Sequence, residues 1–393
     1  MITTTNVIDN ALKKRVSYCY QCGTCSGCCP VSYTQPFSPR AIIYDLLTNP
    51  RPEEILKRTN LLACLTCNYC LQRCPQNVNF GEFIRQARTN LFKEGFRVDE
   101  THECFVSNFS TILAKDQVRP QFPEDYIPKN VQLATKGDVA YFPGCLAILG
   151  AYFDDIGMDF PKIAKSSILI LNKLLDKPLV LLDTAKCCGH DVLWQGDYET
   201  FKKLAQYNVE LIKSTGAKLV ITSCAEGYRT MAIDYKQLFG ELPFKVMHIT
   251  QFLADQLEKG RLKFEKQVPK KVTYHDPCRL GRHMGEYDAP RKLLAALEKV
   301  GVKFTEMERT REMALCCGVS AFNYCNDFAK AIRTDRLKEA EKRADVLLTT
   351  CSKCQIHFNC TLTEKKSSNL ERINIEVRDL VTLIAEAMGV LNE

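Results

Sequence analysis

The stretch that decides the fold runs from Lys271 to Phe358 and carries three cysteine groups: Tyr274-His275-Asp276-Pro277-Cys278, Cys316-Cys317-Gly318 and Thr350-Cys351-Ser352-Lys353-Cys354. The gaps between the groups are 37 and 33 residues long, and each suits a strand, a helix and a loop. Two adjacent cysteines reach two metals of a cluster more easily than one metal of a tetrahedral site. Thiolates this dense, without a histidine at zinc-finger spacing, favour iron and sulfur over zinc.

The same pattern occurs once before in the chain. Tyr141-Phe142-Pro143-Gly144-Cys145 matches the first group, Cys187-Cys188-Gly189 the second, and Thr222-Ser223-Cys224 the third, at offsets of 133, 129 and 127 residues. Matching groups that stay in register over some 80 residues indicate an internal duplication with small gaps. We call the two copies the first and the second CCG repeat, after the Cys-Cys-Gly that each contains.

Each repeat alternates short β-branched runs with helical stretches, which predicts parallel βα units. In the first repeat, the predicted strands are 139–142, 179–182 and 219–222, and the predicted helices are 161–175 and 198–214. Ligands of open α/β sheets lie beyond the carboxyl ends of the strands. Because Cys145, Cys224, Cys278 and Cys351 each follow such a strand, each repeat is expected to gather its cysteines at one edge of its sheet.

The two repeats differ in their last cysteine. The second ends Cys351-Ser352-Lys353-Cys354, whereas the first ends Cys224-Ala225-Glu226-Gly227. The first repeat therefore keeps four thiols, which leave three possibilities open: a further cluster, a zinc ion or no metal. These four are Cys145, Cys187, Cys188 and Cys224. His190 directly follows the Cys-Cys-Gly of the first repeat and is a candidate proton donor, or a group that supports a ligand.

The N-terminal part carries two cysteine runs of the bacterial ferredoxin type, C-x2-C-x2-C-x3-C-P. In this pattern three cysteines wrap one [4Fe–4S] cluster, and the fourth, before a proline, reaches the other cluster. The runs predict one cluster held by Cys19, Cys22, Cys25 and Cys74, and another held by Cys64, Cys67, Cys70 and Cys29. Cys28 lies outside the pattern and is expected to be a packed thiol. Helices are predicted at 38–47, 53–58 and 80–93, which suggests a helical module of the kind found in fumarate reductases.

Composition agrees with a metal-binding protein of a reducing compartment. The 393 residues include 21 cysteines, 46% hydrophobic and 25% charged residues, with no signal peptide and no apolar run long enough for a membrane helix. The net charge of +7 counts cysteines as neutral. Thiolate-bound clusters would offset most of it, so we do not infer nucleic-acid binding. A cytoplasmic protein is expected, with peripheral attachment to the inner face of a membrane through a partner as an alternative.

The predicted fold class is α+β with several domains. A helical dicluster ferredoxin-like domain occupies 1–100, a linker 101–137, the first CCG repeat 138–260 and the second 261–393. The proline-rich part of the linker is 120–136. The stretch 375–391 has an apolar stripe and predicts a packed terminal helix, with docking to a partner protein as a minor alternative.

This layout resembles the D-type iron–sulfur subunits of heterodisulfide reductases, which are themselves similar to a fusion of the C-type and B-type subunits of that enzyme. It is also similar to the K-type subunit of the membrane complex of dissimilatory sulfite reduction and to the iron–sulfur subunits of anaerobic glycerol-3-phosphate dehydrogenase and glycolate oxidase. The resemblance covers residues 17–358. The residues that carry it are Cys22-Gly23-Thr24-Cys25, Ser223-Cys224-Ala225-Glu226-Gly227-Tyr228-Arg229-Thr230 and His275-Asp276-Pro277-Cys278-Arg279-Leu280-Gly281-Arg282.

The resemblance implies a noncubane [4Fe–4S] cluster on the second repeat, where a disulfide is cleaved. Its ligands would be Cys278, Cys316, Cys317, Cys351 and Cys354. Gly227 departs from the family's usual Cys-x2-Cys, which puts a second noncubane cluster on the first repeat in doubt. His275, Arg279, Arg282 and His283 adjoin Cys278 in sequence and are candidates for holding substrate carboxylates or phosphates, or for supplying protons.

Three classes of function fit the cysteines. The first is a disulfide reductase component that takes electrons from, or gives them to, a flavoprotein or a membrane cytochrome. The second is a conduit that links a flavin dehydrogenase of the glycerol-3-phosphate, glycolate or lactate type to a membrane quinone pool. The third is a binding protein organised by zinc. The chain has no G-x-G-x-x-G fingerprint, so NAD or flavin binding is not expected of the chain itself.

Overall fold

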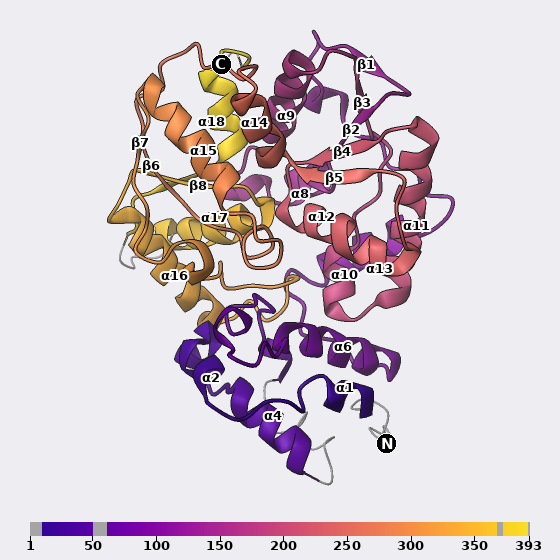
Figure 1. Cartoon of the computed structure of the whole chain (residues 1–393), viewed down its shortest axis with the longest axis vertical. Coiled ribbons are helices and arrows are strands. Elements are labelled where there is room, and N and C mark those ends of the chain that lie inside the picture. The colour runs from indigo at the N-terminus through magenta and orange to yellow at the C-terminus, as the bar shows by residue number, and fades with distance from the viewer. Residues whose placement is uncertain (1–9, 50–60, 368–371, 392–393) are drawn as a thin grey trace.

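The N-terminal part of the chain is helical, as predicted. The computed structural model describes residues 10–49, 61–367 and 372–391, drawn in Figure 1. The N-terminal elements are α1 (Asn10–Lys14), α2 (Thr24–Cys28), α3 (Pro30–Thr34), α4 (Pro39–Thr48), η2 (Leu61–Ala63), η3 (Leu71–Arg73) and α6 (Phe80–Lys93). The Ser38 hydroxyl caps α4 by accepting a hydrogen bond from the Ala41 amide at 3.2 Å. The helix predicted at 53–58 lies outside the described residues.

The first CCG repeat is built on a five-stranded parallel sheet with the strand order β1-β3-β2-β4-β5. Its strands are β1 (Leu133–Ala134), β2 (Val139–Phe142), β3 (Leu179–Leu181), β4 (Leu219–Thr222) and β5 (Lys245–His248). Its helices include α8 (Leu146–Tyr152), α9 (Phe160–Leu174), α10 (His190–Gln195), α11 (Tyr198–Thr215), α12 (Ala225–Arg229), α13 (Tyr235–Phe239) and α14 (Ile249–Glu258). The predicted strands and helices of this repeat are confirmed to within a residue at each end.

The second CCG repeat has a four-stranded parallel sheet with the order β7-β6-β8-β9. Its strands are β6 (Lys271–Tyr274), β7 (Lys303–Phe304), β8 (Val346–Thr349) and β9 (Glu376–Asp379). Its helices are α15 (Asp288–Leu297), α16 (Asp327–Glu341), α17 (Ser352–Ser367) and α18 (Leu380–Ala387). Figure 1 shows the two sheets beside each other, above the N-terminal helices.

Both sheets change their winding direction at the cysteines. In the first repeat the chain passes from β2 to β3 on one side of β2 and then to β4 on the other side. The second repeat does the same with β6, β7 and β8. A crevice opens beyond the carboxyl ends of strands at such a switch point. Cys145 and Cys224 follow β2 and β4, and Cys278 and Cys351 follow β6 and β8, so each pair flanks its crevice.

Two predictions about the ends of the domains need correction. The predicted linker contains the helix α7 (Phe105–Leu113), and its last part forms β1, which pairs with β3. A two-residue edge strand leaves no periodic signal in the sequence, which is why it was missed. The predicted terminal helix begins instead with β9, which pairs with β8, and only 380–387 is helical. The apolar side chains of α18 are buried within this chain, so they do not present a docking stripe.

The apolar cores join the three parts of the molecule. One core contains side chains of both repeats, such as Ile221, Leu253, Val272 and Leu294. A second core joins the N-terminal helices to the second repeat, and Phe358 of α17 belongs to it. The N-terminal part is thus fixed to the second repeat by shared burial rather than tethered by a linker.

Candidate metal centres

The two predicted cubane ligand sets line two small neighbouring cavities in the N-terminal part. One cavity is lined by Cys19, Cys22, Cys25, Cys70 and Cys74, the other by Cys29, Cys64, Cys67 and Cys70. Each cavity therefore contains all four thiols that the ferredoxin pattern assigned to one cluster. Apolar side chains close the walls, including Ile43 and Val78 in the first and Val31 and Phe37 in the second. Four thiols around a small, largely apolar cavity are a donor set that fits an iron–sulfur cluster.

The five thiols predicted for the second repeat form one contiguous group. The Cys316 thiol lies close to those of Cys278 and Cys317, and the Cys354 thiol lies close to those of Cys317 and Cys351. Four of them, Cys278, Cys317, Cys351 and Cys354, line a further cavity. Cys316, Cys317, Cys351 and Cys354 are buried, and Cys278 is half-buried. An all-thiol set of this size fits a cluster better than a single tetrahedral metal.

A thiol of the N-terminal part touches the group in the second repeat. The thiol of Cys67 lies close to that of Cys316, and this proximity lowers the pKa of Cys67 to about 6. Cys316 also lies close to Cys278 and lowers the pKa of that thiol. Cys67 therefore belongs to the wall of one N-terminal cavity and also contacts a thiol of the second repeat. No local pattern indicates this contact, because the two cysteines are about 250 residues apart in the sequence.

The four thiols of the first repeat also lie together. The Cys187 thiol lies close to those of Cys145 and Cys188, and their proximity lowers its pKa well below the ordinary value. Burial, followed by the charge of Cys351, raises the pKa of Cys224. Because Cys224 and Cys351 occupy equivalent positions and influence each other, the two repeats turn their cysteine groups toward one another. A buried set of four thiols can hold either a zinc ion or a cluster.

The predicted polar residues beside Cys278 are buried and engaged by the protein. His275 Nδ1 accepts a hydrogen bond from Arg336 Nε at 3.2 Å, and burial lowers its pKa to about 3. The imidazole is thus neutral and has its proton on Nε2. Arg279 lines the cavity of the second repeat, but its guanidinium donates to Thr66 and stacks on Trp194, 3.9 Å from the ring centroid. The assignment of both residues to substrate or proton handling stays a prediction.

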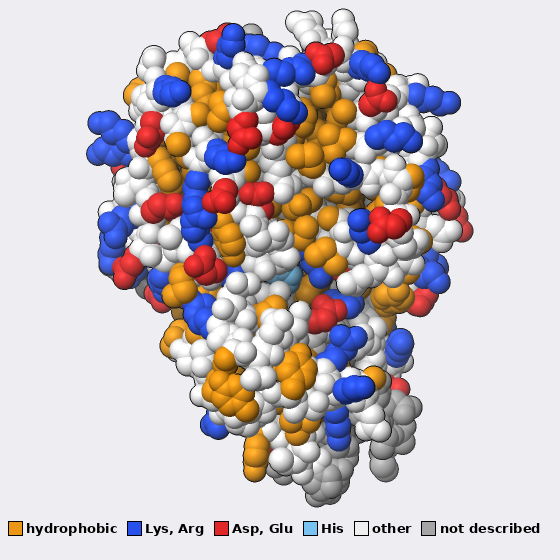
Figure 2. Space-filling view, in the orientation of Figure 1, with side chains coloured by type: hydrophobic (Ala, Val, Ile, Leu, Met, Phe, Trp, Pro, Cys, Tyr) orange, Lys and Arg blue, Asp and Glu red, His pale blue; other side chains and the backbone are white. Residues whose placement is uncertain are grey.

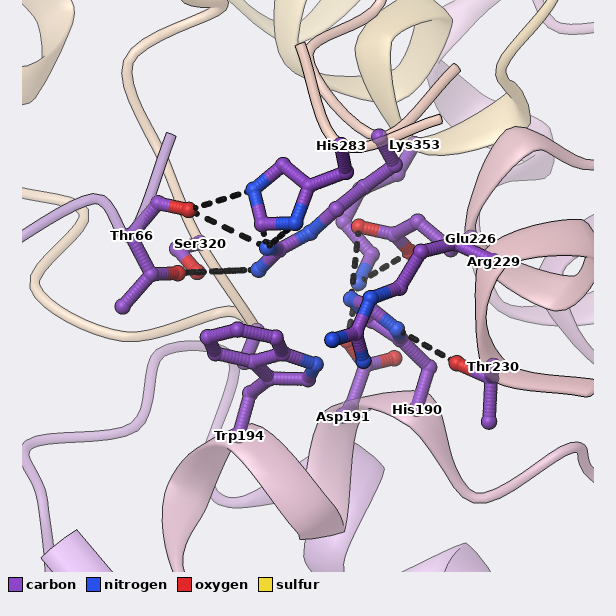
Figure 3. Close-up of polar contacts among 12 residues, drawn as sticks. Thr66, His190, Asp191, Trp194, Glu226, Arg229, Thr230, His283, Ser320 and Lys353 are labelled. Carbon is purple, nitrogen blue, oxygen red and sulfur yellow. Dashed lines mark hydrogen bonds and ion pairs between the residues drawn. The ribbon is translucent and has the colours of Figure 1, made fainter. Parts of the chain in front are cut away.

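A buried ion-pair cluster joins the two repeats (Figure 3). Lys353 Nζ contacts Asp191 and lies 2.6 Å from Glu226 Oε2, and all three side chains are buried. Burial raises the pKa of Glu226 to about 7. His190 Nδ1 shares a hydrogen bond of 2.8 Å with Thr230, and its Nε2 lies 3.4 Å from Glu226. Because the Lys353 ammonium already occupies the space between the carboxylates, they do not form an open metal site.

The alignment of the two repeats indicates the ion pair of Glu226 with Lys353, which the motifs alone do not reveal. Glu226 follows Cys224 by two residues, and Lys353 follows Cys351 by two residues. The two residues are therefore equivalent in the duplication, with opposite charges. Equivalent positions meet when two repeats pack around a pseudo-twofold axis, and an acid opposite a base at one such position predicts a contact between repeats.

Comparisons with known proteins agree with this division of the chain. The 4Fe-4S dicluster domain family matches residues 15–78, and the cysteine-rich domain family matches 139–231 and 272–359. A crystal structure of a hypothetical protein from Helicobacter pylori has the same fold. It covers 98% of this chain and 76% of its own, with a TM-score of 0.62 at 12% identity.

Two of the similar curated proteins are named as subunits of larger enzymes. The B-type subunit of fumarate reductase (CoM/CoB) from Methanothermobacter marburgensis is 27% identical over 92% of this chain and 71% of its own length. The D-type subunit of dihydromethanophenazine:CoB--CoM heterodisulfide reductase from Methanosarcina barkeri is 33% identical over 94% of this chain and 93% of its own length. The family resemblance drawn from the motifs is thereby confirmed, and so is an iron–sulfur oxidoreductase role: the chain belongs to the family of D-type subunits of heterodisulfide reductases.

Proposed function

We propose that this chain is the subunit of an oxidoreductase complex in which a disulfide is reduced, or formed, at the cysteine group of the second repeat. Two cubane clusters in the N-terminal cavities and one noncubane [4Fe–4S] cluster on Cys278, Cys316, Cys317, Cys351 and Cys354 would supply the one-electron chemistry. The net reaction joins a disulfide, two electrons and two protons to give two thiols. The similar protein from Methanosarcina barkeri is named for the CoB–CoM heterodisulfide, which makes that disulfide the first candidate substrate.

The contact between Cys67 and Cys316 carries this proposal. It links a cavity of the N-terminal part directly to the second repeat, so electrons have a short path between them. The burial of four of the five thiols keeps water away from the reacting sulfur atoms. His275 is neutral and fixed by Arg336, so we assign it the donation of an Nε2 hydrogen bond near Cys317 rather than the binding of an anion.

An electron donor or acceptor must bind near the cluster cavity that lies farther from the second repeat. Cys22 is exposed, whereas Cys64 and Cys67 are buried. We therefore assign the exchange of electrons with a flavoprotein or a membrane cytochrome to the cavity that contains Cys22. No helix among the described residues is long and apolar enough to cross a membrane. Acidic and basic side chains are interspersed over the repeats on the face drawn in Figure 2, and attachment to the inner face of a membrane would run through the partner.

The alternative is a conduit without disulfide chemistry, favoured by the likeness to EtfAB:quinone oxidoreductase of Syntrophomonas wolfei, 28% identical over 67% of this chain and 37% of its own length. For the first repeat, a zinc ion or a further cluster on Cys145, Cys187, Cys188 and Cys224 both suit the four thiols. Metal analysis decides between them.

An anaerobic assay separates the two functions. The purified chain, with reduced benzyl viologen as donor, is expected to oxidise the dye when the CoB–CoM heterodisulfide or another small disulfide is added. Cys317→Ser should abolish the disulfide-dependent rate, and Cys104→Ser, which changes an exposed cysteine outside every group, should leave it unchanged. A protein with fully loaded clusters that passes electrons to a quinone analogue but oxidises no dye with any disulfide would establish the conduit instead.

A further inference from the structure

Two arginines of the second repeat lie on the turn that follows β6. The Leu280 and Gly281 amides both donate to the Pro277 carbonyl, at 3.1 and 2.9 Å, so the chain coils directly after Cys278. This coil directs Arg279 and Arg282 toward the N-terminal part, and both side chains are buried, with 2% and 6% of their surface exposed. Buried guanidinium groups need several hydrogen-bond acceptors, and each of these two finds at least one acceptor in the N-terminal part.

Three of their acceptor atoms belong to the loop between Cys64 and Cys70. Arg282 Nε donates to the Cys67 carbonyl at 2.7 Å, and its Nη1 donates to the Ala314 carbonyl at 2.6 Å. Arg279 donates to the Thr66 carbonyl at 3.1 Å and to the Thr66 hydroxyl at 2.8 Å. Arg282 thus bridges the residue that contacts Cys316 and the chain that leads into Cys316 itself.

The loop has a backbone that needs such support. Thr66 and Asn68, on either side of Cys67, have φ values of 48° and 60°, in the left-handed region that residues with a Cβ rarely adopt. Such conformations persist when the surroundings hold them. The carbonyl groups of Thr66 and Cys67, which belong to this strained part, are the ones that the arginines bind.

We propose that Arg279 and Arg282 are positioning residues that clamp the Cys64–Cys70 loop onto the second repeat and thereby set the electron coupling between the two centres. The proposal rests on the electron route put forward above. The clamp holds the Cys67 sulfur against Cys316, and its fixed positive charge favours the reduced, more negative state of the adjacent centres. Charge and hydrogen bonding near a cluster are among the features that set its potential.

The two effects separate in two variants of Arg282. Arg282→Lys keeps the charge but loses the planar fork that reaches both carbonyls, so it should slow electron transfer into the second repeat about 10-fold or more while the potentials stay close to those of the wild type. Arg282→Gln removes the charge as well and should also lower the potential of the adjacent centre. Arg291→Gln is the matched control, because it removes a partly buried guanidinium of the same repeat, with 11% of its side chain exposed, that binds Asp276 and Glu306.

The measurements use the full, cluster-loaded protein and need no disulfide. Electron paramagnetic resonance during a dithionite titration gives the potentials, rapid mixing with dithionite gives the rates, and hydrogen exchange reports the amides of residues 64–70. Exchange there should rise about 10-fold or more in both Arg282 variants and in Arg279→Gln, at unchanged iron content, and stay unchanged in Arg291→Gln. Wild-type exchange and wild-type rates in the Arg282 variants would overturn the clamp. If a variant loses iron, hydrogen exchange at residues 64–70 is compared between the metal-free variant and the metal-free wild type. A rise of about 10-fold or more supports the clamp, and equal exchange overturns it. If the Arg282 variants show these effects but the wild type reduces no disulfide, the proposed function is refuted and the clamp is not.

Discussion

Lys353→Met tests the buried ion-pair cluster that joins the two repeats. The substitution keeps an unbranched side chain of similar length but removes the one cation that contacts both Asp191 and Glu226. The two carboxylates stay buried, at 6% and 9% exposure. Breaking a buried ion pair by removing one partner costs about 3–5 kcal/mol, so we expect the free energy of unfolding to fall by about that amount, a large part of the usual total.

The assay uses the single tryptophan of the chain. Trp194 is buried and lies beside this cluster, with its ring centroid 5.9 Å from that of His190. Anaerobic urea unfolding followed by its fluorescence therefore reports the junction of the repeats. Lys173→Met is the control, because its pair with Glu265 is exposed and should contribute less than about 1 kcal/mol.

A triple variant tests the physical reason for the loss. Lys353→Met combined with Asp191→Asn and Glu226→Gln leaves no uncompensated charge, and it should recover most of the stability lost in the single variant. If the free energy of unfolding of the single variant lies within about 1 kcal/mol of the wild-type value, the ion pair does not stabilise the junction of the repeats. A triple variant that is as unstable as the single one would also refute the reasoning, because the carboxylates would then not be the cause.

Three further predictions concern the scaffold. Burial raises the pKa of Asp379 to about 7 from an ordinary value near 3.9, so its native state binds a proton more tightly than the unfolded chain, and this stabilisation of up to about 4 kcal/mol is lost as pH rises from about 4 through 7. Asp379→Asn should remove that pH dependence, so its free energy of unfolding, measured with urea, should rise relative to that of the wild type from pH 5 to pH 8. Stability curves of the two proteins that run parallel over this pH range would contradict the prediction. Gly196→Ala should lower the thermal midpoint much more than Gly216→Ala: both glycines have positive φ, but only at Gly196 would a Cβ collide with the Arg88 backbone. Ser38→Ala should cost about 1 kcal/mol through the lost cap of α4, and an unchanged urea midpoint would show that the cap contributes nothing.

The strands and the cysteine groups were open to prediction because their signals are local. Short β-branched runs before Cys145, Cys224, Cys278 and Cys351 predicted the strands, and parallel topology predicted that the cysteines gather at one edge. The prediction of one helix over 375–391 was wrong because the four-residue edge strand β9 runs directly into α18. One apolar stripe spans both elements. A stripe of that length satisfies the helical period as a whole and conceals the strand.

The contacts between domains were not open to prediction in the same way. Arg279 and Arg282 bind backbone carbonyls of residues more than 200 positions away. Because every residue has a backbone carbonyl, the sequence does not indicate which one accepts such a bond. The contact between Cys67 and Cys316 depends on how the N-terminal part packs on the second repeat. Only the pairing of Glu226 with Lys353 had a signal, through the alignment of the two repeats.

The proposed disulfide chemistry requires a cluster on the second repeat beyond the two of the N-terminal part. Anaerobic iron, sulfide and zinc analysis of the wild type and of Cys317→Ser, together with electron paramagnetic resonance before and after a thiol is added to the oxidised protein, tests it most directly. We expect at least about 12 irons in the wild type, about four fewer in Cys317→Ser, and a thiol-dependent signal in the wild type alone. About 8 irons in both proteins, with no response to the thiol, would contradict it.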